Sequence, residues 1–312
     1  MKLKLYEMKI ILTIILVTLI FSVCQSQSFD LSLKLENGKV YRQITNSKLN
    51  ISQEVNGQTM NMAMTISGTM TFLVKAIDGN GFDMDTKFEK LSMSMQMPQA
   101  TMEFNSEKKD ENDVFSNILG AMIGKTFLVT MTKTGKVTEI KNVEALWGTA
   151  INQFDQLSDR HREQIKGQIM QSYGAAALKG NLEMVTAIYP DQPVGIGEKW
   201  AINTKLESGM PAIMNTNYEL VDLTSDYGLI RGNSTIKTAD KDAYIEANGM
   251  PMKYDLTGSV KSEIKVDKNT GWTMEAKINQ EIKGDAYIKA NPQIPGGMKI
   301  PMTMTTEMAV TN

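Results

Sequence analysis

The chain has 312 residues, a formal net charge of −2 at pH 7, one histidine and one cysteine. A mildly acidic chain without a basic cluster argues against nucleic acid and anionic membrane surfaces as partners. One histidine and one cysteine are too few for a zinc site or a histidine relay, and a cysteine–histidine pair would need both of them. We therefore expect neither enzyme activity nor a cofactor.

The N-terminal segment has the pattern of an export signal. A short basic stretch precedes the apolar run Ile10–Val23, which is too short to span a bilayer comfortably. Cleavage after Ser26 gives a signal peptide over residues 1–26. Lipidation of Cys24 is the alternative, although Val23 stands where such signals normally have a small residue, and an uncleaved segment is the third possibility. We expect an exported chain, periplasmic, associated with the outer membrane or secreted, with no transmembrane span once mature.

Alternating patterns predict strands in the next part of the chain. Phe29–Leu35 alternates as a half-buried strand, and Asn37-Gly38 suits a hairpin turn. The clearest alternation is Met60–Val74, with apolar residues at even positions and mostly threonine, serine and asparagine at odd positions. After the turn Asp78–Gly81 the alternation changes phase, which predicts a bulge at Glu89–Lys90. A short helix over 113–123 and a hairpin over 127–140 follow.

Between Asn142 and Tyr189 the pattern becomes helical. Asn142 should cap the first helix, its side chain accepting a hydrogen bond from a first-turn amide. A second helix is expected from Ser158 to Gly174, and a third from Ala175 towards Ile188. One-sided helices need a partner surface, which the sheet provides. The apolar stripe of the first helix comprises Val143, Leu146, Trp147, Ala150, Ile151, Phe154 and Leu157.

After the helices the strand pattern returns. Val260–Ile278 reads as a second hairpin around Asp267–Gly271. One constant shift in numbering aligns Gly68 with Gly258, Gly81 with Gly271 and Phe82 with Trp272. Upstream, the turn Asn56-Gly57 corresponds to Asn248-Gly249. This register favours a duplicated β-unit, although antiparallel hairpins also resemble one another without common origin.

These patterns predict an α+β fold, in which a large, curved, mostly antiparallel β-sheet of two related β-units packs around a central helical insert. The first β-unit with its short helix covers 27–141, the helical insert 142–189 and the second β-unit 190–312. No stretch has the composition of an interdomain linker, so residues 27–312 should form one compact domain.

Methionine is unusually frequent, with 24 residues. The methionines of Met60–Met64 and Met93–Met97 alternate in phase with other apolar residues, as the packed face of a sheet requires. A face of thioethers can also re-pack around a ligand and leave a cavity for an acyl chain. Binding of soft metals such as Cu(I) ranks lowest, because no histidine or cysteine lies among these residues. The candidate ligand-binding residues are Met62, Met64, Met70, Met84, Met93, Met95, Trp147 and Phe154.

The stretch Tyr189–Trp200, with its Pro–x–x–Pro–Val and Gly–x–x–Trp spacing, resembles a family of exported, uncharacterised Bacteroidota proteins. Thr134–Val137 and the helix after it are also similar to that family. The resemblance implies a domain of unknown function and no catalytic residue. The strand–helix–strand layout looks like the half-barrel of periplasmic lipoprotein and lipid carriers, in which a curved sheet holds helices in its hollow.

The hypothesis that follows is an exported, non-enzymatic envelope protein that binds an apolar ligand such as a lipid or an acyl chain. The alternative is a structural or interaction module that binds an envelope protein through exposed strand faces or sheet edges. A core filled completely by its own side chains is the simplest interpretation of the same pattern.

Overall fold

A computed structural model describes residues 28–154, 157–206, 210–247, 250–292 and 294–312. The expected signal peptide and Cys24 lie outside the described residues. The strands are β1 (Val40–Val55), β2 (Gln58–Ile77), β3 (Gly81–Met97), β4 (Ala100–Asn105), β5 (Thr126–Thr132), β6 (Val137–Lys141), β7 (Lys199–Leu206), β8 (Ala212–Leu223), β9 (Tyr227–Thr238), β10 (Ile245–Ala247), β11 (Met250–Asp267), β12 (Thr273–Ile288) and β13 (Met298–Thr311). The helices are α2 (Val114–Met122), α3 (Val143–Asn152), α4 (Asp159–Tyr173) and α5 (Ala175–Thr186).

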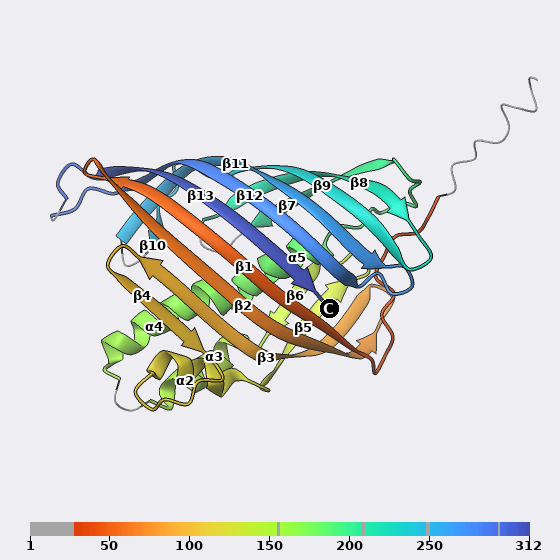
Figure 1. Ribbon diagram of the computed structural model, residues 1–312, viewed down its shortest axis with the longest axis horizontal. Coiled ribbons are helices and arrows are strands. Elements are labelled where there is room, and N and C mark those ends of the chain that lie inside the picture. The colour runs from red at the N-terminus through yellow and green to blue at the C-terminus, as the bar shows by residue number, and fades with distance from the viewer. Residues whose placement is uncertain (1–27, 155–156, 207–209, 248–249, 293) are drawn as a thin grey trace, which may run out of the picture.

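Within the described residues the strands form one 13-stranded sheet, with the main order β6-β5-β3-β2-β1-β13-β12-β11-β9-β8-β7. β4 pairs with β3, and β10 pairs with β11. The sheet consists of two antiparallel meanders, which meet where the first strand, β1, pairs with the last, β13. Figure 1 shows these long strands crossing the molecule diagonally. The predicted fold class is confirmed.

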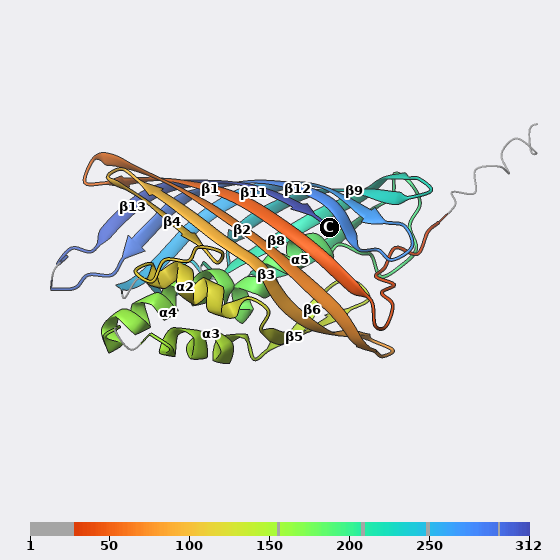
Figure 2. The same ribbon diagram turned by 60° about the horizontal axis from the view of Figure 1, so that its bottom comes forward.

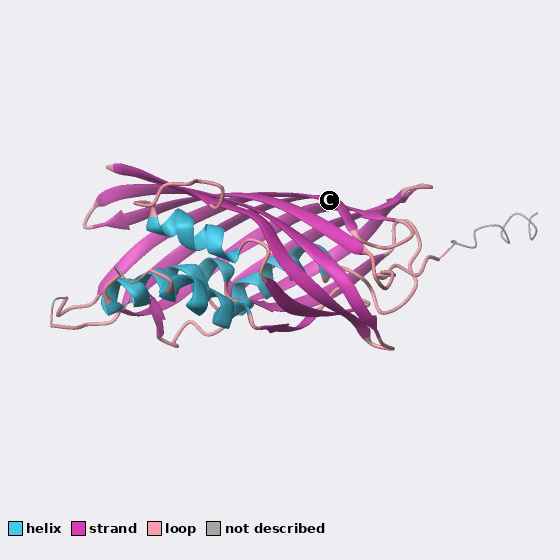
Figure 3. Cartoon of the chain, turned by 90° about the horizontal axis from the view of Figure 1, so that it is seen from below, coloured by secondary structure: helices cyan, strands magenta, loops and turns pink. Residues whose placement is uncertain are grey.

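The helices lie on one side of the curved sheet, as Figures 2 and 3 show. α2 packs on β3 and β4, α3 packs on β5, and α5 packs on β6 and β12. α4 contacts α3 and α5. The apolar sides of the helices and one face of the sheet thus share a hydrophobic core, as one-sided helices require.

Most predicted helix ends are confirmed, but the first helix differs. α4 is capped by Ser158, whose hydroxyl accepts a hydrogen bond from the His161 amide, and it ends at Gly174. Asn142 occupies the predicted N-cap position, but it has a left-handed φ of 70° and its side chain makes no capping hydrogen bond, so the predicted side-chain cap is wrong. Asparagine tolerates this conformation, and here it turns the chain into the helix while its carbonyl accepts a hydrogen bond from the Leu146 amide. α3 also ends earlier than expected, at Asn152.

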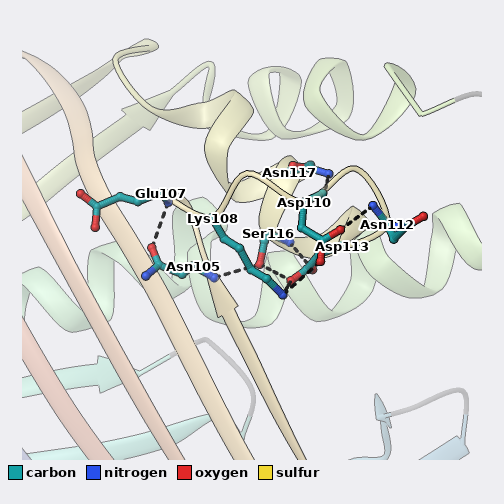
Figure 4. Close-up of polar contacts among 8 residues, drawn as sticks. All are labelled: Asn105, Glu107, Lys108, Asp110, Asn112, Asp113, Ser116 and Asn117. Atoms are coloured by element: carbon teal, nitrogen blue, oxygen red, sulfur yellow. Dashed lines mark hydrogen bonds and ion pairs between the residues drawn. The ribbon is translucent and has the colours of Figure 1, made fainter.

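A polar loop fixes the start of α2 (Figure 4). The Asp113 carboxylate accepts hydrogen bonds from the Ser116 amide at 3.0 Å and from the Lys108 ammonium at 2.8 Å. Burial alone would raise the pKa of Asp113, but the hydrogen bonds from Lys108 and Ser116 and the Lys108 charge outweigh it and lower that pKa overall. The loop therefore holds the aspartate ionised at the positive end of the helix.

The segment Phe29–Leu35 is not the paired strand that its alternation predicts. It is an extended segment with a single bridge, from Phe29 to Val194. Its backbone N–H groups donate to carbonyls of two turns, Lys133 between β5 and β6 and Thr270 between β11 and β12. The leucines at its alternate positions are buried in the main core. The alternation does reflect one buried side of the segment, but this side packs on the main hydrophobic core, and the segment does not pair with a strand of the sheet.

The predicted bulge in β3 is confirmed. Thr69 lies opposite Lys90 and Met70 lies opposite Phe88, which leaves Glu89 as the extra residue. The bulge shifts the alternation by one position, so that apolar residues on both sides of it reach the core.

The two hairpins matched by the proposed duplication, β2–β3 and β11–β12, close with similar turns. The carboxylates of Asp78 and Asp267 each accept two backbone hydrogen bonds within their own turn. A Cβ at Gly81 or Gly271 would collide with a neighbouring backbone segment. β8 and β9 nevertheless have no counterpart in the described part of the first unit, and Asn248-Gly249 lies outside the described residues. The duplication stays an interpretation.

Candidate functional site

The sheet has an inner face, defined here as the face that carries the hydrophobic core. Residues directly opposite each other on neighbouring strands point to the same face. A row of such residues, the apolar row, crosses the inner face from β2 to β8 and contains no ionisable side chain. It consists of Met62, Ile51, Met304, Ile282, Gly258, Ile236 and Met214.

The predicted ligand-binding residues all belong to the inner side, but they do not line one cavity. Three of them are buried in the main hydrophobic cluster, namely Met84, Met93 and Trp147. Three others are partly buried against it, namely Met64, Met70 and Phe154. Met62 and Met95 are partly exposed. The methionine strands and the helices therefore share one core, while the thioethers near the turn of β2 remain accessible.

The surroundings of Trp147 are those of a residue packed in the core. Its ring lies against those of Tyr173, at 5.7 Å between centroids, and Phe88, at 6.1 Å. Its indole N–H donates to the Tyr173 carbonyl at 3.1 Å. Burial raises the pKa of the Tyr173 phenol well above its usual value, so this ring stays neutral. Trp147 thus anchors α3 to α4 and β3.

A second hydrophobic cluster lies further along the inner face. Its described members come from strands and loops and none from a helix. They include the buried side chains of Leu256, Ala286, Ile288, Ile300, Met302 and Met304. Elsewhere on the same side of the sheet Met60 is 41% exposed and Met102 is 36% exposed. The described helices thus leave part of the inner face accessible to solvent.

A hollow of about 160 Å³ adjoins the second cluster. Its size is close to that of an engineered apolar cavity of about 150 Å³ that admits benzene. The apolar row leads into it, because Ile282 and Ile236 belong to both. Gln280 contributes its polar side chain. The apolar lining consists of Leu206, Met210, Pro211, Ala212, Ile236, Leu256 and Ile282.

Charged side chains avoid the inner face. On the described parts of β1, β9, β11, β12 and β13, every aspartate, glutamate, lysine and arginine occupies the outward-facing alternate positions. The tyrosines of the inner face are neutral as well. Burial raises the pKa of Tyr218 to about 12, and it also raises that of Tyr254. The face is therefore uncharged at physiological pH.

The outer face carries a different hollow, of about 560 Å³, over β1, β2, β3 and β13. Its lining is mixed: outward-facing polar side chains alternate with Ile51 and Met62 of the apolar row, and Met97 and Pro98 complete it. The Asn50 amide donates to the Thr305 hydroxyl at 3.4 Å across the seam of β1 and β13. The outward-facing side chains that line it are Asn50, Ser52, Asn61, Ala63, Gln96, Thr303 and Thr305.

The described residues contain no group of three or more histidine, cysteine, aspartate or glutamate side chains placed to hold a metal ion. Among the same residues, no helix combines the length and apolar character needed to cross a membrane.

A family model described as a family of unknown function (DUF6263) matches residues 78–273, more than half of the chain. The chain belongs to this family. The DUF6263 match includes all described helices and the strands from β3 to β11, and leaves β1, β2, β13 and all but the first residue of β12 outside. The predicted membership of an uncharacterised family is confirmed, whereas the Bacteroidota source stays a prediction.

No curated protein matches this DUF6263 chain. Similar solved structures include the COG4313 outer membrane channel from Pseudomonas putida F1, with 7% identity, TM-score 0.24, and coverage of 89% of this chain and 97% of that chain. Another is a DUF1329 family protein from Desulfovibrio piger, with 7% identity, TM-score 0.14, and coverage of 87% and 84%. TM-scores this low do not establish a common fold, so the likeness to lipoprotein and lipid carriers stays a prediction.

The sequence pattern missed part of the inner face. Met302 and Met304 stand in an alternating stretch, but nothing local indicates that β13 pairs with β1. Gln280 was missed because a glutamine in a strand usually faces water. The one signal available was its phase, since Gln280 shares the even positions of Ile278 and Ile282.

Proposed function

We propose that this DUF6263 protein is an exported envelope protein that holds an apolar chain on the inner face of its sheet and acts by binding, not by catalysis. The observation that carries the proposal is the apolar row, which joins the accessible thioethers of β2 to the hollow beside the second cluster. Within the row Met304, Ile236 and Met214 are buried, whereas Met62, Ile51 and Ile282 are only partly buried and leave apolar surface for contact with a ligand. Methionine suits a chain of variable shape because its thioether re-packs.

The proposal can be tested on protein recovered from the envelope of cells that express the full chain. Native mass spectrometry should show extra mass that organic extraction removes. The extracted protein should then enhance the fluorescence of N-phenyl-1-naphthylamine, a neutral apolar probe. A clean apo mass together with no saturable probe binding would end the proposal. Recovery from the cytosol alone would contradict export.

A matched pair of variants tests on which face of the sheet the probe binds. Met62→Gln keeps the length of the side chain but makes a half-buried position of the apolar row polar. We expect it to weaken probe binding about three- to tenfold, in line with the loss of about 1 kcal/mol of apolar contact. Asn61→Gln, the neighbouring exposed position on the outer face, should leave binding unchanged. Equal effects of both variants would mean that the probe does not lie on the inner face.

A second candidate function is favoured by the polar hollow of the outer face. A hollow lined by amides, hydroxyls and some apolar side chains offers a protein partner both hydrogen bonds and apolar contact, as protein interfaces do. In this function the protein is an interaction module of the envelope. Thr303→Trp would fill the hollow while leaving the inner face intact. Loss of a cross-linked envelope partner from this variant, with probe binding retained, would favour the module over the carrier.

A further inference from the structure

The inner face places a second row beside the apolar row, two residues further along each strand. This polar row consists of Thr306, Gln280, Ser234 and Thr216, with Val260 between Gln280 and Ser234. All four polar side chains are neutral donors and acceptors. From β13 to β8 the apolar row and the polar row therefore run side by side, whereas on β1 and β2 the second row continues with the apolar Leu49 and Met64.

Some side chains of the polar row form hydrogen bonds with one another, and others do not. The hydroxyls of Thr216 and Ser234, both buried, bond each other at 2.8 Å. The Gln280 amide, by contrast, has no hydrogen-bond partner among the described residues. It lines the hollow of about 160 Å³, whose other inward-facing polar side chain, Thr238, already bonds the backbone of Leu256. Gln280 thus offers both a donor and an acceptor to whatever occupies the hollow.

We infer that the ligand of this face is an uncharged amphiphile, whose hydroxyl, ester or amide end meets Gln280 while its hydrocarbon chain lies along the apolar row. This inference rests on the proposed function and adds the class of ligand.

The physical reason is the absence of any compensating charge on the described inner face. Among the residues that line the hollow, Lys237 is the only cation, and it occupies the exposed, outward-facing alternate position of β9 between Ile236 and Thr238. A carboxylate or phosphate held on the inner face would therefore lose its hydration without an inward-facing lysine or arginine to pair with. A hydroxyl or ester loses much less hydration free energy on burial, and a hydrogen bond with the Gln280 amide replaces the hydrogen bond that it made with water.

The test uses extracted full-chain protein loaded with N-phenyl-1-naphthylamine at pH 8. The competitors are dodecanol, dodecanoate and dodecyl phosphate, below their aggregation limits. We expect dodecanol to displace the probe at concentrations at least about tenfold lower than either anion, because burying an unpaired charge is costly. Displacement by dodecanoate equal to that by dodecanol would overturn the inference but leave the proposed function standing. Absence of probe binding would instead end the proposed function.

Two variants of Gln280 sharpen the result. Gln280→Lys supplies the missing cation and should raise the affinity for dodecanoate relative to dodecanol by at least about tenfold. Gln280→Leu keeps the volume, removes both hydrogen-bonding groups and should reduce the preference for dodecanol over dodecane. Asn279→Lys adds the same charge at the adjacent exposed position of β12, on the outer face, and should change neither ratio. If Gln280→Lys and Asn279→Lys behave alike, Gln280 does not meet the ligand end.

Discussion

Methionines of identical chemistry occupy different environments along the inner face. The thioether of Met84 is fully buried among the helices, whereas that of Met62 is partly exposed. An unbranched side chain with three rotatable bonds fills space when it is enclosed and moves aside when it is not. The surroundings, rather than the residue type, therefore decide which of these methionines pack the core and which are available to a ligand.

The left-handed conformation of Asn142 gives a prediction at this scale. Asn142→Gly should leave stability unchanged or raise it slightly, because glycine adopts a φ of 70° without a Cβ penalty. Asn142→Val should lower the free energy of unfolding by about 1–2 kcal/mol, since a branched side chain clashes in that conformation. Urea denaturation measures both. Ala145→Val, at an exposed position of α3, controls for helix propensity, and a Val effect no larger at 142 than at 145 would contradict the prediction.

The Asp113 cap gives a prediction of pH dependence. Its pKa is lowered in the folded protein, so its stabilising effect is present above its unfolded pKa of about 3.9 and is lost as the pH falls through the folded pKa. Asp113→Ala should cost about 0.5–2 kcal/mol at pH 7. Thermal unfolding of both proteins should converge below about pH 4. Glu111→Ala, at an exposed position of the same loop, should show no such convergence, and a pH-independent Asp113→Ala difference would refute the assignment.

At the scale of elements, the segment Phe29–Leu35 closes the core without joining the sheet. Leu33, which is 2% exposed, packs into the main cluster from this segment. Leu33→Ala should therefore lower the free energy of unfolding by about 2–5 kcal/mol, as for other buried leucines. Ser32→Ala, next to it, should stay within about 0.5 kcal/mol of the parent protein. Similar values for the two variants in urea would show that the segment is not part of the cooperative core.

Much of the arrangement of elements could be predicted because the signals are local. Ser158 and Gly174 mark the ends of α4, and a change of phase marks the bulge at Glu89. Alternation also gives the two faces of each strand, and hence the methionine side of the sheet. It cannot give the strand order, because the contact of β1 with β13 joins residues at opposite ends of the chain. Nor can it show where helices cover that side, which separates the buried Met84 from the accessible Met62.

At the scale of the whole molecule, the sheet separates charge from apolar surface. Its outer face carries the lysines and glutamates of the central strands, and its inner face carries none among the described residues. The charged side chains of the central strands are therefore hydrated on the outer face, while the inner face presents apolar and neutral polar groups.

This separation predicts an order of methionine oxidation. With dilute hydrogen peroxide, Met60 and Met102, which are 41% and 36% exposed, should be oxidised first. Met84 and Met131, both 0% exposed, should be oxidised last. Peptide mass spectrometry measures the rates. Bound dodecanol should slow oxidation at Met62 more than at Met102. Uniform rates for all four positions would contradict the buried core, and unchanged rates on loading would contradict binding on the inner face.

The pairing of β1 with β13 has a consequence for how the protein is made. During synthesis the N-terminal half emerges first, yet β13, which completes its exposed edge, emerges after all the other described strands. Until then β1 exposes unpaired backbone N–H and C=O groups and an apolar face to other chains. Deletion of β13 as a whole would remove the central seam and leave two open half-sheets, whereas loss of a few of its residues would remove only part of the pairing with β1. This one strand therefore governs the assembly of both halves.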